Sequence, residues 1–268
     1  MGFTSKRVNN WNPWINSNWL TCVLLQEEEE RRTVAVRKIL RSIDVFIDTY
    51  PSDGGCDEGP GYWGRAGASL FDCLELLSLG TNESIRIYDE PLIQKMASFI
   101  YKTHIDKEWY VNFADASARV KPSAFLVYRF GQRINDEKMI AFGAALLAEA
   151  GQSRGETLQR HLPMLFSDDT GETATKSIPY ESQIWLDQIE VMCARESQGS
   201  PKGFFLGAKG GHNAESHNHN DIGTFIVYEA GRPLIVDTGV GTYTGQTFGD
   251  TRYELFTMRS GYHNVPLV

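Results

Sequence analysis

Roughly the first 150 residues carry apolar positions at helical spacing. Behind the charged run EEEERR, which suits a helix N-terminus, apolar side chains recur every three or four positions up to Tyr50. A similar pattern begins near Trp63 and ends at Gly80, a residue type that commonly ends helices. Further helical patterns cover about 91–104, 122–133 and 136–150. The sequence therefore predicts successive helices joined by short loops.

After Gly151 the pattern becomes β-like. A mixed stretch containing the polar run SDDTGETATKS is followed by GFFLGAKGG, TFIVYE and PLIVDT, which are short apolar runs typical of strands. The link AGR between the last two is typical of a hairpin. Helices followed by antiparallel strands indicate the α+β class with more than one domain. We place the boundary at about 190–200, which gives a helical part, 1–195, and a β part, 196–268.

Composition and charge narrow the functional classes. A chain of 268 residues with 41% apolar residues can bury a substantial core. The formal net charge of −8 argues against a general nucleic-acid binder, because a polyanion-binding surface needs a basic excess. No run approaches the roughly 20 apolar residues of a membrane helix, so we expect no membrane insertion. The N-terminus lacks a signal-peptide pattern, and the four cysteines form no CxxC pair.

The stretch SHNHND places His217 and His219 just before a predicted strand. Asp237 ends the returning strand, and His263 follows later. Two histidines and a carboxylate, completed by water, form a ligand set that zinc accepts. On the spacing alone, a polar loop whose histidines form local hydrogen bonds is the favoured interpretation.

A glycine-rich loop, GGCDEGPGYWGRAG, precedes the helix that begins near Trp63. Such loops carry function more often than the elements that they join. Tyr62 could donate or accept a proton if a neighbouring group lowered its pKa from about 10. Alternatively, Tyr62 packs between helices.

Five asparagines and three tryptophans crowd the segment RVNNWNPWINSNWL. Asparagine is a poor helix former, so its density in a predicted helix needs a reason. Aromatic faces and amide groups suit the apolar faces and hydroxyl edges of sugar rings. A tryptophan-rich core layer with asparagines in turns is the alternative.

Together, NNWNPW, DEGPGYWGRAG and HNHNDIGTFIVYEAGRPLIVDTG resemble the heparinase II/III-like polysaccharide lyases, a family that includes heparinase II, heparinase III and oligoalginate lyases. The resemblance covers nearly the whole chain. Its most specific part is HxHxD followed by an apolar strand, a glycine turn and a strand ending in D-x-G. It implies part of an (α/α) toroid followed by the start of an antiparallel β-sandwich. We therefore expect a fragment truncated at both ends.

The resemblance also implies β-elimination at a uronic acid, which leaves a 4,5-unsaturated sugar. Removing the weakly acidic C5 proton requires neutralisation of the sugar carboxylate and a base and an acid flanking C5 and O4. By motif, Tyr62 matches the catalytic tyrosine and His217 the active-site histidine. Asn10 matches the carboxylate neutraliser, with Asn12 as second choice. The residues expected to contact substrate are Asn12, Trp14, Glu58, Trp63 and Arg65.

In heparinase II-like members a zinc ion stabilises the sandwich, and His219, Asp237 and His263 match its ligands in type and order. We expect the His217 and His219 rings to point in opposite directions, one towards the sugar and one towards the metal. Because chain ends fray, His263 is the weakest ligand, so we expect this chain to hold zinc weakly and the full-length protein to hold it well.

The leading functional hypothesis is a lyase acting on an acidic polysaccharide, with heparin or heparan sulfate first and alginate or another uronan second. The resemblance further implies a periplasmic or secreted protein, and the oligomeric state is open. One alternative is a catalytically inactive carbohydrate-binding remnant. Another is a hydrolase using Asp57 and Glu58, although adjacent carboxylates rarely form the opposed pair that hydrolysis needs.

Overall fold

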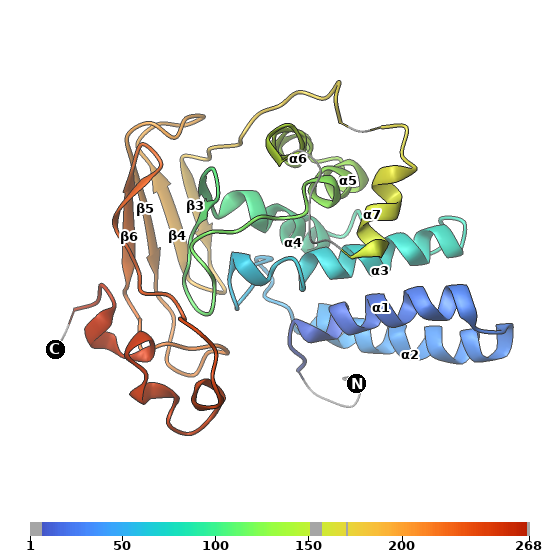
Figure 1. Cartoon of the computed structure of the whole chain (residues 1–268), viewed down its shortest axis with the longest axis horizontal. Coiled ribbons are helices and arrows are strands. Elements are labelled where there is room, and N and C mark those ends of the chain that lie inside the picture. The colour runs from blue at the N-terminus through green and yellow to red at the C-terminus, as the bar shows by residue number, and fades with distance from the viewer. Residues whose placement is uncertain (1–6, 151–156, 170, 267–268) are drawn as a thin grey trace. The chain divides into compact units, whose positions relative to one another are not determined.

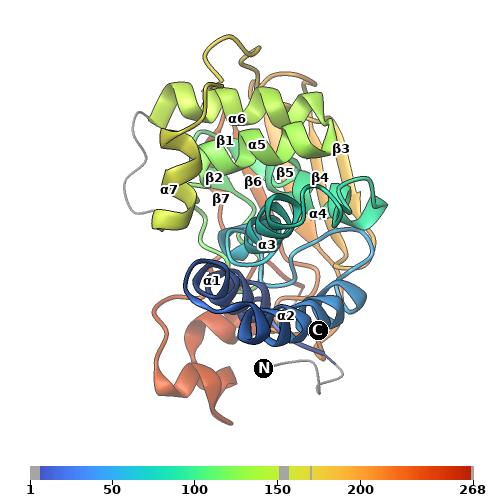
Figure 2. The ribbon, with the colours of Figure 1, turned by 90° about the vertical axis from the view of Figure 1, so that its right-hand side faces the viewer.

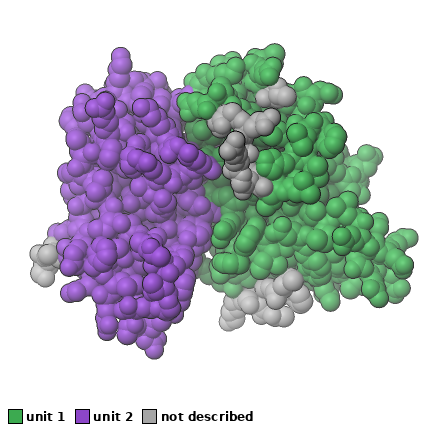
Figure 3. All heavy atoms as spheres, in the orientation of Figure 1, with its two compact units in different colours: residues 1–50, 63–97, 122–177 green, residues 51–62, 98–121, 178–268 purple. Residues whose placement is uncertain are grey.

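The computed structural model describes residues 7–150, 157–169 and 171–266. The chain forms two compact units, each built from three segments (Figure 3). Unit 1 comprises 1–50, 63–97 and 122–177, and unit 2 comprises 51–62, 98–121 and 178–268. Within the described residues, no helix has the length and apolarity needed to span a membrane.

Unit 1 is helical. Helices α1 and α2 form one hairpin, and α5 and α6 lie side by side as another (Figure 2). Helix α3 contacts both α1 and α5. The helices are α1 (Trp11–Gln26), α2 (Glu29–Asp48), α3 (Gly67–Gly80), α5 (Ala124–Ile134), α6 (Glu137–Ala150) and α7 (Leu158–Leu165), while α4 (Pro91–Lys102) is shared by the two units.

The predicted helices from Glu27 to Gly80 are confirmed as α2 and α3. On α2, Ile39, Ile43 and Phe46 recur at three and four positions and are buried, and acidic residues fill its first turn. Helix α3 is buried along most of its length, and its Phe71 ring stacks on Phe130 at a centroid distance of 4.4 Å. Apolar periodicity therefore selects the packing faces of unit 1.

Unit 2 contains a five-stranded antiparallel sheet in the order β3-β4-β5-β6-β7 (Figure 1). The predicted AGR hairpin joins β6 to β7, and Ala230 and Gly231 take positive φ angles of 47° and 74° in its turn. The strands are β3 (Gln183–Leu186), β4 (Val191–Arg195), β5 (Phe204–Lys209), β6 (Phe225–Glu229) and β7 (Arg232–Ile235), and a separate pair comprises β1 (His104–Asp106) and β2 (Trp109–Tyr110).

One face of the sheet packs against the segment that carries β1 and β2. The Arg195 guanidinium donates hydrogen bonds to the backbone carbonyls of His104 and Ile105, at 2.5 and 2.9 Å. Trp109 meets Tyr228 edge to face at 5.9 Å between ring centroids. These contacts bury one face of the sheet within unit 2.

The opposite face presents apolar side chains to solvent. Its first cross-strand row is Trp185, Met192, Ala208 and Phe225, and its second is Ala194, Leu206, Val227 and Ile235. Within these rows Trp185 is 60% exposed and Ile235 is 38% exposed. Solvent therefore reaches apolar side chains on both edge strands of the sheet.

The sequence boundary at 195 differs from the structural division. It falls at the end of β4, so β3 and β4 precede it although both belong to the sheet. The segments 51–62 and 98–121 also belong to unit 2. These two segments belong to unit 2 because of contacts with residues far away in the sequence. The spacing of apolar residues along the chain gives no information about such contacts.

Candidate functional site

The loop 51–62 belongs to unit 2 and carries two of the residues expected in the site. The Asp53 carboxylate accepts hydrogen bonds from the backbone N–H groups of Gly55, Gln188 and Ile189, at 2.8, 2.7 and 3.1 Å. These bonds fasten the loop to the turn between β3 and β4. The loop carries Glu58 and Tyr62, so Asp53 limits the positions available to both.

Gly59 allows this loop to approach the segment 113–117. Its φ is +93°, and a Cβ atom added there would lie 2.5 Å from the Cβ of Ala116 and 2.9 Å from the Phe113 carbonyl oxygen. Any side chain at this position would therefore clash and also strain the backbone. Glycine lets the loop lie against the segment that contains Asp115.

The Asp115 carboxylate is the common acceptor of the site and is fully buried. Its Oδ2 accepts from His217 Nδ1 at 3.0 Å, while its Oδ1 accepts from His219 Nε2 at 2.9 Å and from Arg252 Nη2 at 3.0 Å. The Tyr243 hydroxyl is also hydrogen-bonded to it. We call these five residues the Asp115 cluster.

Electrostatics favour the anionic form of Asp115. Burial alone would raise its pKa, but the hydrogen bonds from His217 and His219 and the charge of Arg252 lower the pKa well below its usual range. Conversely, burial would lower the pKa of His217, whereas its bond to Asp115 and the nearby charge of Glu58 raise it. The Nδ1 atom of His217 lies 3.5 Å from Glu58 Oε1.

The expectation that His217 and His219 point in opposite directions is wrong. Both rings reach the Asp115 carboxylate, one at each oxygen. In a regular extended segment, residues two apart share a face. The segment departs from this regular geometry at His217, whose φ is +57°, and the two rings approach different oxygens of the carboxylate. The two rings share one acceptor but differ in exposure, since the His217 side chain is 23% exposed and that of His219 is fully buried.

Tyr62 joins this network through Tyr243. Its hydroxyl donates to the Tyr243 hydroxyl at 2.7 Å. Because an ionised carboxylate only accepts, Tyr243 donates its own proton to Asp115. Burial and the bond from Tyr62 raise the pKa of Tyr243, which keeps this hydroxyl protonated. A directed path of hydrogen bonds therefore runs from Tyr62 to Asp115.

A second group of possible ligands comprises His219, Asp221 and His263, whose ligand atoms all lie within 4.8 Å of one another. The Nδ1 atom of His219 and the Oδ2 atom of Asp221 are buried and have no hydrogen-bond partner among the residues that the structure describes. Leaving such atoms without partners is costly, so these atoms could serve as ligands of a metal ion. The bond from His219 Nε2 to Asp115 also matches metal sites, where the other ring nitrogen donates to a carboxylate.

Asp237 lies beside this group. Its Oδ2 accepts from His263 Nδ1 at 2.7 Å, and its Oδ1 accepts from the Gly239 N–H at 2.9 Å. Nε2 of His263 bonds to the Thr257 carbonyl at 2.9 Å. The His263 ring is therefore buried and held at both nitrogens, whereas its place near the chain end led us to expect fraying. A metal would replace one of these hydrogen bonds.

The asparagines proposed for catalysis and substrate binding lie in unit 1. Asn10 is buried and precedes the first residue of α1. The Asn12 side chain donates to the Ser42 hydroxyl at 2.8 Å, and Asn16 donates to the same hydroxyl at 3.0 Å. Asn12 therefore connects α1 with α2.

The aromatic candidates fall into two kinds. The guanidinium carbon of Arg65 lies 4.6 Å from the centre of the Trp14 ring and 5.9 Å from that of Trp11, whose side chain is half exposed. Trp63 is instead buried, and its indole N–H donates to the Met96 carbonyl at 2.7 Å. A sugar could reach Trp63 only after rearrangement of this core.

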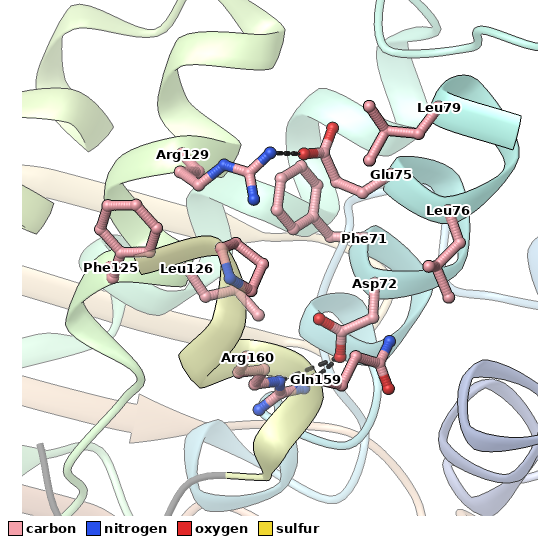
Figure 4. Close-up of a pocket in the computed structure, with 11 residues that line it drawn as sticks. Phe71, Asp72, Glu75, Leu76, Leu79, Phe125, Leu126, Arg129, Gln159 and Arg160 are labelled. Atoms are coloured by element: carbon pink, nitrogen blue, oxygen red, sulfur yellow. Dashed lines mark hydrogen bonds and ion pairs between the residues drawn. The ribbon is translucent and has the colours of Figure 1, made fainter. Parts of the chain in front are cut away.

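Unit 1 also contains a small pocket between α3, α5 and α7 (Figure 4). Its volume of about 70 Å³ is well below that of sites for small organic ligands. Its charged groups pair with one another, Arg160 with Asp72 at 2.7 Å and Arg129 with Glu75. The described residues that line the pocket therefore offer no unpaired charge to a ligand.

Several residues of the site escaped the sequence analysis, namely Asp115, Asp221, Tyr243 and Arg252. Asp115 lies 102 positions from His217 along the chain and belongs to no recognisable motif. Asp221 follows directly from HNHN in the same histidine stretch, so its spacing could have identified it.

Comparison with known proteins supports the resemblance. Residues 204–264, which hold the histidine stretch and β5 to β7, match the family described as Heparinase II/III-like, C-terminal. No curated protein matches the chain.

Among solved structures, a heparinase III aligns with a TM-score of 0.68 and 19% identity over 96% of this chain and 38% of its own. A heparan sulfate lyase, HepC from Pedobacter heparinus, aligns with a TM-score of 0.58 and 16% identity over 91% of this chain and 35% of its own. The chain thus spans about two fifths of these proteins or less. We conclude that its helices and antiparallel sheet share the fold of the corresponding parts of these solved structures and that residues 204–264 are similar to the heparinase II/III-like C-terminal family.

Proposed function

We propose that the full-length gene product is a polysaccharide lyase that cleaves a uronic-acid-containing polysaccharide by β-elimination. The observation that carries this proposal is the path from Tyr62 through Tyr243 to Asp115, which also holds His217. It places a phenol and an imidazole, two kinds of group that act as acids and bases in catalysis, in one network. Heparan sulfate or heparin is the first substrate to test, because the similar solved structures are of a heparinase III and a heparan sulfate lyase.

Elimination requires a base to remove the C5 proton and an acid to protonate the leaving O4. The Tyr62 hydroxyl would protonate O4, and Tyr243 and Asp115 would orient that hydroxyl. His217 would take the C5 proton or pair with the sugar carboxylate. Asn10 would stabilise the negative charge that develops on the carboxylate in the transition state.

The residues proposed to contact substrate differ in how far their side chains already have partners within the protein. Trp14 and Arg65 form an aromatic and cationic surface suited to an anionic sugar, and Glu58 lies next to His217. Asn12 and Trp63 already have partners within unit 1, so we rank them below the others.

The donor set near His219 fits a zinc ion. We propose that Nδ1 of His219 binds zinc together with His263 and Asp237, and that Asp221 lies close enough to contribute its unpaired oxygen. The ion would connect the loop before β6, the end of β7 and the segment near residue 263. The zinc ion would have a structural role, because it would hold these three segments in fixed positions.

The remaining expectations belong to the same proposal. The helical hairpins of unit 1 would be part of an (α/α) toroid, and the sheet would be one layer of a β-sandwich. The protein would act in the periplasm or outside the cell, where acidic polysaccharides are degraded.

The decisive experiment incubates the full-length product with heparan sulfate, chondroitin, hyaluronan and alginate. Ultraviolet absorbance of the unsaturated uronide, with one uronan class preferred, is the expected result. New reducing ends without absorbance would indicate a hydrolase. Retention on immobilised polysaccharide without cleavage would indicate a carbohydrate-binding protein. Either outcome would overturn the lyase proposal.

A further inference from the structure

A single buried carboxylate contacts both histidines of the SHNHND stretch. Oδ2 of Asp115 accepts from His217, Oδ1 accepts from His219 and Arg252, and the Tyr243 hydroxyl also donates to this carboxylate. We propose that Asp115 is a positioning residue that fixes which ring nitrogen of His217 carries the proton. The inference rests on the role proposed above for His217, but it makes a claim about hydrogen placement that can be tested without turnover.

The acceptor chemistry of Asp115 determines the tautomer. An ionised carboxylate cannot donate, so the hydrogen of this bond belongs to Nδ1 of His217. The Glu58 carboxylate, 3.5 Å from the same nitrogen, favours the same placement. In the neutral ring, Nε2 then carries the lone pair. This is the nitrogen that can accept a proton from substrate.

The backbone shows that the surroundings hold the ring in place. His217 adopts a φ of +57°, a region that is uncommon for residues other than glycine, although histidine enters it more often than most. Such a conformation persists only where neighbouring contacts determine it. The bond to Asp115 is one of these contacts, and Asp115 is itself held by Arg252 and Tyr243.

The other oxygen extends this control to His219. Because His219 donates through Nε2, its Nδ1 is left with a lone pair in the group that contains Asp221 and His263. Asp115 thus assigns Nδ1–H to His217 and Nε2–H to His219. One carboxylate imposes opposite tautomers on two histidines separated by a single residue.

Asp115→Asn tests this assignment with almost no change in volume. The amide oxygen would take the place of Oδ1, because an amide NH₂ there would face the donors of Arg252 and His219. The NH₂ group would then occupy the position of Oδ2 and donate to Nδ1 of His217. Nδ1 must become an acceptor, so the proton moves to Nε2 and the lone pair needed for catalysis is lost.

We would measure tautomers by nitrogen-15 NMR of histidine-labelled full-length protein. Wild type should show Nδ1–H at His217, and Asp115→Asn should show Nε2–H. The tautomer of His219 and the zinc content should not change, because the amide oxygen still accepts from His219. We also expect kcat to fall by about 10²-fold or more, with KM within a few-fold of wild type.

Glu58→Gln is the matched control for the tautomer, because it neutralises the second carboxylate near Nδ1 and leaves Asp115 intact. We expect it to retain Nδ1–H at His217. An Nε2–H tautomer in the wild type would overturn the proposal even if Asp115→Asn failed to fold. An unchanged tautomer in folded Asp115→Asn would do the same. If the tautomer changes while wild type eliminates none of the polysaccharides, the lyase proposal fails and the role of Asp115 stands.

Discussion

The hydroxyl of Tyr62 donates a hydrogen bond to the hydroxyl of Tyr243 across 2.7 Å, although the two residues are 181 positions apart in the chain. Tyr243 in turn bonds to Asp115. The two phenols thus have different roles in the resting protein. Tyr62 is the first donor of the path, and Tyr243 both accepts and donates.

The change Tyr62→Phe removes one oxygen and almost no packing volume. For a general acid we expect kcat on the preferred uronan to fall by about 10²-fold or more, with little change in thermal stability. Initial rates of unsaturated product formation and a thermal melt measure the two effects. Turnover within a few-fold of wild type would remove Tyr62 from the mechanism.

The matched change Tyr243→Phe removes the acceptor of the Tyr62 bond but leaves the Tyr62 hydroxyl in place. Losing one orienting hydrogen bond costs about 1 kcal/mol, so we expect a loss of turnover of about tenfold or less. The same rate assay compares the two variants directly. An equal or larger loss in Tyr243→Phe would indicate that Tyr243 is the proton donor.

Substitutions of His217 and His219 should have different effects on turnover and on metal content. We expect His217→Ala to lose turnover and keep its metal, because its ring bonds Asp115 on the exposed side of the cluster. His219→Ala should lose the metal, because it removes the buried Nδ1. Elemental analysis and rate measurements on both variants test this. A loss of zinc in His217→Ala would contradict the separation.

Zinc should stabilise unit 2. We expect about one zinc per chain in the full-length protein, and a chelator should lower the temperature at which the β-sheet melts. Because His263 is held at both nitrogens, we expect the 268-residue chain also to bind zinc, although its binding should be weaker than that of the full-length protein.

Asp237→Asn should lower zinc affinity by about tenfold or more, whether Asp237 binds the ion or only orients His263. Asp221→Asn provides the comparison, because Asp221 has a buried oxygen without a partner. Competition with a chromogenic chelator measures both affinities. A metal-free wild type whose melting is unaffected by chelator would refute the site.

Stability should fall in mild acid because of His104. Burial lowers the pKa of this ring from 6.5 to about 4 despite its bond to the Lys107 carbonyl. The ring therefore takes up a proton below about pH 6.5 in the unfolded chain but only below about pH 4 in the folded protein. Between these pH values the unfolded chain binds more protons, so the stability of the fold decreases as the pH falls from 6.5 to 4. The difference between a pKa of 6.5 in the unfolded chain and about 4 in the folded protein corresponds to a loss of at most about 3.4 kcal/mol.

Urea unfolding at several pH values measures this effect, with His104→Gln as the control. The variant should lose the part of the pH dependence that His104 supplies. His217 and His263, whose pKa values are raised, contribute with the opposite sign and are present in both proteins. Equal pH slopes for the two proteins would contradict the prediction.

Local patterns predicted much of the fold. The apolar spacing of α2 and α3 and the glycine turn between β6 and β7 each arise within a few residues, so the sequence displays them directly. The histidine motif likewise identified His217 and His219. The strands β3 and β4 and the composition of unit 2 depend on contacts between distant segments, and these were missed.

The site was predicted in part for the same reason. Asp115 occurs in the unremarkable run NFADAS, and only folding brings it to the two histidines. A motif names the residues that share a short stretch of chain. It does not name the acceptor that lies across the fold and determines their protonation.

The outward face of the sheet affects how the protein can be handled. Two rows of apolar side chains lie open between edge strands β3 and β7. In β7, Pro233 lacks an N–H and so limits pairing of this edge with another strand, but Leu234 and Ile235 beside it are exposed. At high concentration these surfaces can adhere between molecules, so light scattering should rise with concentration before the fold is lost. Colloidal behaviour would then limit crystallisation and spectroscopy sooner than unfolding does.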